Sequence, residues 1–140
     1  MKDALTIFAS HFTPPGPATG GAASFCIPSL TGCADAFLAV TLAAKEEDGR
    51  PKTEDKVVLA ITPGLPDADR LADDIRTLIS AVPPSTFHLQ PRLLEFPPKL
   101  DGDKTALGTR LKTIAALKAW SLNPYPCVIV APFPALATPI

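Results

Sequence analysis

Residues 31–36 occupy the place of a phosphate-binding loop, after an apolar run at 24–30 and before a helical pattern at 36–44. A working loop ends in Gly-Lys-Ser/Thr, because backbone amides and the lysine hold the phosphates while the hydroxyl holds magnesium. Here Asp35 stands at the lysine position and Ala36 at the hydroxyl position. We interpret the segment as a vestigial phosphate loop, whose members are Thr31, Gly32, Cys33, Ala34, Asp35 and Ala36. The simpler alternative is an ordinary turn, because Thr-Gly often precedes a helix.

The remaining residues with reactive side chains form no recognisable catalytic or metal-binding set. His11 and His88 have no evident serine or cysteine partner. The three cysteines, Cys26, Cys33 and Cys127, form no CxxC pair and lie in or beside apolar runs, which favours reduced structural thiols. We therefore expect no catalytic residue, no metal ligand and no bound cofactor in this chain.

The composition is that of a globular chain of single-domain length, with 140 residues, 46% hydrophobic and 19% charged. Its net charge is −1, and its 13 lysines and arginines are scattered along the chain. A protein that binds nucleic acid by itself normally carries a basic stripe, so we expect poor affinity for DNA. We expect no membrane span, because no apolar run is long enough to cross a bilayer. The N-terminus lacks the pattern of a signal peptide, and we expect a cytoplasmic protein.

The spacing of apolar residues predicts strands that alternate with helices. Residues 1–23 are expected to form an N-terminal segment with a Pro/Gly-rich loop, and residues 24–140 an α/β domain. The alternation predicts crossover connections, and hence a three-layer fold in which a parallel sheet has helices on both faces. The four expected strands are 24–30, 57–61, 86–90 and 127–131.

Two longer amphipathic helices are predicted between these strands. The first has apolar residues at helical spacing, namely Ala68, Leu71, Ala72, Ile75, Leu78 and Ile79. Its carboxylates point in different directions around the helix, so we interpret them as a solvated face and not a metal site: Asp67, Asp69, Asp73 and Asp74. After a Pro-bearing loop at 91–103, the second helix has its expected apolar face at Leu107, Leu111, Ile114 and Ala115, widened by Leu117 and Trp120. A short helix is expected to start at Phe133.

The order and spacing of these segments resemble the N-terminal UvrB-like module of the bacterial transcription-repair coupling factors (Mfd). The resemblance runs from about Ser24 to the end of the chain, and its motifs are specific in combination. Two departures are the replacement of the family's Trp-Glu-x-Leu-Pro-Tyr stretch by residues 98–102 and a longer connection at 46–55. The segments that carry the resemblance are Leu30-Thr31-Gly32 and residues 57–63, 67–76, 94–97, 109–117 and 128–132.

The resemblance implies a P-loop-NTPase-like fold of the UvrB and helicase type, with a degenerate nucleotide loop and a strand order of third, second, fourth, first. It also implies a fragment of a longer protein, an ATP-dependent DNA translocase that displaces stalled RNA polymerase and recruits UvrA for nucleotide excision repair. ATP and magnesium are implied for the motor domain alone, and contacts with DNA and RNA polymerase for other domains.

For this non-catalytic module the implied partner is UvrA, bound directly or through an adjoining subdomain, and the implied state is a monomer. A different class of function stays open, namely a stand-alone α/β domain that binds or converts a small molecule in a crevice at the carboxyl ends of its strands. A screen for bound small molecules would separate the two hypotheses.

Overall fold

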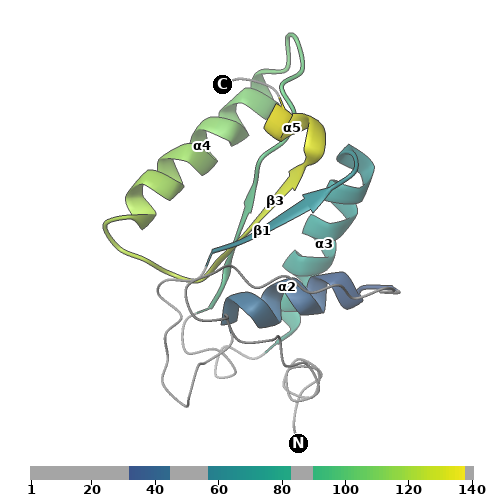
Figure 1. Cartoon of the computed structure of the whole chain (residues 1–140), viewed down its shortest axis with the longest axis vertical. Coiled ribbons are helices and arrows are strands. Elements are labelled where there is room, and N and C mark those ends of the chain that lie inside the picture. The colour runs from purple at the N-terminus through teal and green to yellow at the C-terminus, as the bar shows by residue number, and fades with distance from the viewer. Residues whose placement is uncertain (1–31, 45–56, 83–89, 138–140) are drawn as a thin grey trace, which may run out of the picture.

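The computed structural model describes residues 32–44, 57–82 and 90–137, and the account below is limited to them. The predicted alternation of helices and strands is confirmed in these residues. Along the chain the elements are α2 (Ala34–Ala44), β1 (Val57–Thr62), α3 (Leu65–Ala81), β2 (Arg92–Glu95), α4 (Lys104–Trp120), β3 (Cys127–Pro132) and α5 (Phe133–Ala137). Figure 1 shows α4 on one side of the sheet and α2 and α3 on the other. No helix among the described residues has the length and apolar character needed to cross a membrane.

The sheet is parallel and has the order β1-β3-β2, so the last strand in the sequence is central. Val57 of β1 lies opposite Cys127, and Arg92 of β2 lies opposite the same residue from the other edge. All six residues of β3 are buried. A strand with neighbours on both edges and helices on both faces must be apolar throughout, which explains the sequence Cys-Val-Ile-Val-Ala-Pro.

The main core lies between the sheet and the helices α2 and α3. The predicted inner face of α3 is confirmed, because Ala68, Leu71, Ala72 and Ile75 are buried there. Small residues of α2 allow the two helices to approach each other and the sheet closely. The core cluster comprises Ala36, Ala39, Val40, Ala43, Ala68, Leu71, Ala72, Ile75, Val82, Val128 and Val130.

The predicted inner face of α4 is wrong. Leu107 and Leu111 are 48% and 52% exposed, whereas Ala106, Arg110 and Thr113 are the buried residues of this helix. The helix is therefore rotated, so that Arg110 and Thr113 face the fold while Leu107 and Leu111 face outward.

Polar contacts of Arg110 explain this orientation of α4. Its Nη1 donates to the carbonyl of Pro97 at 2.9 Å and to that of Ala135 at 3.3 Å. Its guanidinium also lies 4.2 Å from the centroid of the Phe96 ring. The hydroxyl of Thr113 donates to the carbonyl of Glu95 at 2.6 Å. Because these contacts tie α4 to backbone groups beyond the end of β2 and in α5, they set which face of the helix turns inward.

The predicted loop at 91–103 contains a strand, β2 at Arg92–Glu95. Residues 86–89 of the predicted third strand lie outside the described residues. Prolines on both sides of β2 gave the local pattern of a turn. Pairing with β3 overrides that local signal: Arg92 N–H donates to Pro126 O at 3.0 Å, and Phe96 N–H donates to Val130 O at 2.9 Å.

The predicted strand order is confirmed for one pair and wrong for another. The second strand was expected beside the fourth, and β1 does pair with β3, but β2 takes the other edge of β3, the strand that follows it through α4. Strands joined by a single helical crossover commonly lie side by side. Because β1 and β2 occupy the two edges of β3, the expected pairing of the fourth strand with the first has no place in this sheet. The predicted first strand at 24–30 itself lies outside the described residues.

Candidate functional site

The described part of the segment interpreted as a vestigial phosphate loop, residues 32–36, forms a turn and the start of α2. Thr31 lies outside the described residues, and Gly32 is the first loop member whose position is described. Its φ of 62° is in the left-handed region, which glycine adopts without strain. The first helical turn closes where Phe37 N–H donates to the carbonyl of Cys33 at 3.2 Å. The described part of the loop therefore has the turn and the helix start that the sequence predicted.

Asp35 places its own carboxylate at the N-terminal end of α2. One oxygen accepts a hydrogen bond from the Ala36 N–H at 2.8 Å, and the other accepts one from Nη2 of Arg70 at 2.8 Å. The free N–H groups at the start of a helix attract anions, which is why working phosphate loops use them. Here a carboxylate of the same chain already supplies the negative charge. An external phosphate would therefore meet repulsion at this end of the helix.

Arg70 of α3 joins the loop to a second carboxylate. Its Nη1 donates to Asp74 one helical turn later, at 3.1 Å, while Nη2 contacts Asp35. The hydrogen bond to Asp35, followed by the charge of Asp35, raises the pKa of Arg70 above its ordinary value. The guanidinium therefore stays charged, and it is paired with the carboxylates of Asp35 and Asp74. Because the Arg70 side chain is about half exposed, the pair orients the start of α2 more than it stabilises the fold.

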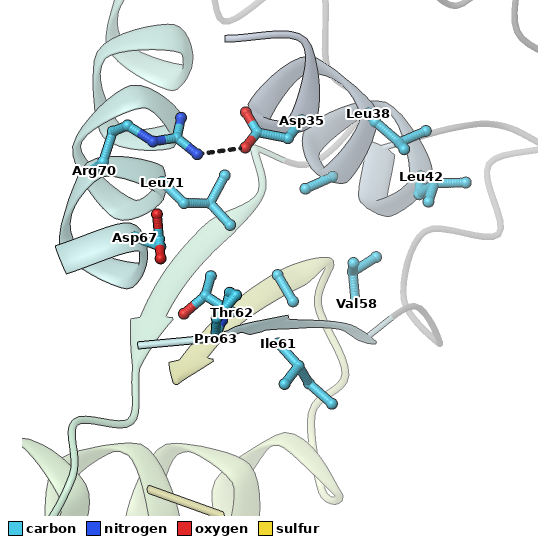
Figure 2. Close-up of a pocket in the computed structure, with 12 residues that line it drawn as sticks. Asp35, Leu38, Leu42, Val58, Ile61, Thr62, Pro63, Asp67, Arg70 and Leu71 are labelled. Carbon is cyan, nitrogen blue, oxygen red and sulfur yellow. Dashed lines mark hydrogen bonds and ion pairs between the residues drawn. The ribbon is translucent and has the colours of Figure 1, made fainter. Parts of the chain in front are cut away.

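A hollow of about 370 Å³ lies beside this pair, between α2, β1 and the start of α3. Figure 2 shows Asp35 and Arg70 facing each other above the hollow, with Asp67 on the same helix as Arg70. The hydroxyl of Thr62 donates to the carbonyl of Gly64 at 3.0 Å, which fixes the turn at the end of β1. The apolar side chains that line the hollow belong to Leu38, Ala39, Leu42, Val58, Ala60, Ile61, Pro63 and Leu71.

The other residues with reactive side chains do not gather at this site. Among the described residues no group of three or more His, Cys, Asp or Glu could hold a metal ion. Cys33 is exposed in the loop, whereas Cys127 is buried in β3, and burial raises the pKa of the Cys127 thiol. A thiol whose pKa is raised is a poor nucleophile at neutral pH. Cys26, His11 and His88 lie outside the described residues.

The sequence did not identify Arg70 as part of the site. Asp35 and Arg70 are 35 positions apart, and each looks like an ordinary residue of a helix start. The available signal was the aspartate at the lysine position, since a buried or loop carboxylate next to a helix end commonly finds a cation. Choosing that cation requires the packing of α2 on α3, which only the structure gives.

No family model, no curated protein and no solved structure matches this chain.

Proposed function

We propose that this chain is the non-catalytic N-terminal module of a transcription-repair coupling factor. Such a factor is an ATP-dependent DNA translocase that displaces stalled RNA polymerase and recruits UvrA for nucleotide excision repair. The proposal is supported by the ordered resemblance that runs from about Ser24 to the end of the chain. The parallel sheet with helices on both faces agrees with the general α/β class of such a module, although its strand order differs from the implied one.

The observation that carries the proposal is the contact between Asp35 and Arg70. A nucleotide enzyme keeps a cation and a hydroxyl in its phosphate loop, and it keeps the helix end open for phosphate. In this chain the loop has a carboxylate and an alanine at those positions, and the nearby guanidinium binds that carboxylate. A fold that keeps the turn and the helix start of such a loop while it fills the phosphate position points to a role in recognition. We therefore assign the chain to the P-loop-NTPase-like class with a degenerate loop.

In this proposal the chemistry belongs to other parts of the protein. ATP and magnesium are used by the motor domain, and other domains contact DNA and RNA polymerase. The module itself is a cytoplasmic monomer that takes part in UvrA recruitment, directly or through an adjoining subdomain.

The test is a pull-down with purified UvrA. The 140-residue chain is compared with a longer polypeptide that also contains the adjoining subdomain, and circular dichroism checks that both are folded. We expect the longer polypeptide to retain UvrA and the short one to retain little or none. If neither retains UvrA while both are folded, the partner assignment is wrong.

A further inference from the structure

One edge of β1 has no strand beside it among the described residues. β1 pairs with β3 alone, although its sequence Val-Val-Leu-Ala-Ile-Thr contains no charge, no proline and no glycine. Protein sheets usually protect such an edge with lysine, proline or a bulge. An edge strand of this composition is suited to pair with another strand.

The 370 Å³ hollow lies beside this edge strand, between β1 and the helices α2 and α3. Its lining includes Val58, Ala60 and Ile61 of β1. Because β1 is at the edge of the sheet among the described residues, the hollow adjoins its unpaired edge. Figure 2 shows Val58 pointing toward α2 and Ile61 pointing away from it, with Leu42 of α2 near Val58. We call this hollow the β1 edge groove, lined by Leu38, Leu42, Val58, Ala60, Ile61 and Asp67.

The outer face of β1 is apolar and uncovered. Val57, Leu59 and Ile61 alternate along the strand and are 39%, 50% and 55% exposed. The helix on this side of the sheet, α4, contacts β2 and so lies away from β1. A strand added to β1 could therefore place apolar side chains at alternate positions under α2, and side chains such as threonine, which carry a methyl group, beside Leu59 on the other face.

The charge at one end of the groove selects a cation. At the carboxyl end of β1, the carboxylates of Asp35, Asp67 and Asp74 act together on the single guanidinium of Arg70. Arg70 bonds to two of them, and Asp67 is exposed and has no ion-pair partner among the described residues. The local charge is thus negative, and a lysine or arginine that arrives here gains a carboxylate partner.

We propose that the β1 edge groove binds an extended segment of a partner protein, which adds to the unpaired edge of β1 and continues the parallel order of the sheet. The segment is apolar at alternate positions and carries a lysine or arginine at its C-terminal end, beside Asp67. Backbone hydrogen bonds supply affinity in this mode, and alternate side chains and the terminal cation supply specificity. This interaction goes beyond the proposed UvrA role, and it holds whichever family the chain belongs to.

The test uses a fluorescently labelled peptide in which valine alternates with threonine and the last residue is lysine. Binding to the full chain is followed by fluorescence anisotropy, and hydrogen exchange reports which β1 amides become protected. We expect saturable binding and new protection in β1. A peptide with proline at its centre lacks a backbone donor, and one that ends in glutamate has the wrong charge. Both are expected to bind at least about tenfold more weakly, which corresponds to about 1.4 kcal/mol.

Two pairs of variants localise the site. Leu42→Glu puts a charge in the groove, and Asp67→Lys reverses the charge at its end; each is expected to weaken binding about tenfold or more. Their matched controls are Leu111→Glu on the exposed face of α4 and Asp69→Lys in the same turn of α3, both expected to change affinity less than about twofold. Circular dichroism checks the fold of each variant.

Several outcomes would overturn the proposal. One is equal binding of the proline peptide and the alternating peptide, and another is no saturable binding at concentrations of about 1 mM. If sedimentation shows a dimer that Leu42→Glu dissociates, the occupant is a second copy of the chain. If hydrogen exchange shows that the β1 amides pointing away from β3 are already protected without peptide, another segment of this chain fills the groove. None of these results depends on UvrA, so they can be distinguished from a failure of the proposed function.

Discussion

The carboxylate of Asp35 and the guanidinium of Arg70 meet at 2.8 Å, which joins the start of α2 to α3 across 35 residues of sequence. The same carboxylate also accepts the Ala36 N–H. Asp35 is therefore a structural part of this arrangement, because its carboxylate joins the start of α2 to α3. This contact bears on any substitution made in the loop.

The chain is expected to bind no magnesium-ATP, because Asp35 repels phosphate and Ala36 offers no metal ligand. The double variant Asp35→Lys with Ala36→Thr restores the residue types but places a lysine beside Arg70, where two cations repel each other. It is also expected to bind no ATP. Isothermal titration calorimetry with both proteins measures this. A micromolar dissociation constant for the natural chain would contradict our interpretation of the loop.

Duplex DNA is expected to bind poorly at physiological salt. The net charge is −1, and the carboxylates around Arg70 make the nearby surface negative. Affinity for DNA depends on neutralising phosphates with clustered cations, which the chain lacks. A titration of labelled duplex in about 0.15 M salt, followed by fluorescence anisotropy, tests this. Micromolar binding whose affinity falls steeply with salt would show a basic surface that we have not identified.

Replacing Arg110 with methionine is expected to lower the free energy of unfolding by about 2–3 kcal/mol. The variant keeps an apolar stem but loses the charged hydrogen bonds to the carbonyls of Pro97 and Ala135. Leu111→Ala, one position later on the exposed face, is the matched control and is expected to change stability by less than about 0.5 kcal/mol. Urea unfolding followed by circular dichroism gives both values. A larger loss at Leu111 than at Arg110 would mean that α4 packs through the face predicted from the sequence.

Stability is expected to fall in alkaline solution because of Cys127. Burial raises the pKa of this thiol above its ordinary value of 9.0, so the folded state holds its proton more tightly than the unfolded state. The contribution to stability is complete below pH 9.0 and is lost as the pH rises through the folded pKa. Urea unfolding between pH 7 and pH 10 measures it.

Cys127→Ala is expected to be less stable at every pH but to lose this alkaline dependence. Cys33→Ser, which changes an exposed thiol, is expected to keep it. If the alkaline loss is the same in Cys127→Ala and in the natural chain, another group causes it.

The sequence predicted those parts of the fold that depend on local pattern. The apolar spacing of α3 and the apolar run of β3 each indicate a buried element, and both are confirmed. The continuous apolar run of β1 predicts a strand covered on both faces; the strand is confirmed, but one of its faces is exposed because no helix among the described residues covers it there. The exposed leucines of α4 gave the wrong face, because a buried arginine with backbone partners decides the orientation of that helix. Hydrophobic periodicity does not detect such a residue.

The remaining differences arise from contacts between distant residues. The position of β2 follows from its pairing with β3, which the local proline signals conceal. The loop turn before α2 was predictable, since Gly32 and the residues after it have the composition of a helix start. Its pairing with Arg70 was not, because that contact depends on how two helices pack.

The central position of β3 has a consequence for synthesis on the ribosome. Val57 lies opposite Cys127, 70 positions later in the chain, and β2 has the same partner strand. The first two strands therefore leave the ribosome before the strand to which both bond exists. Sheets that depend on such distant pairings fold slowly. Until residue 132 has been made, β1 and β2 lack the strand with which both pair, and the apolar side chains of β1 are open to association with other chains.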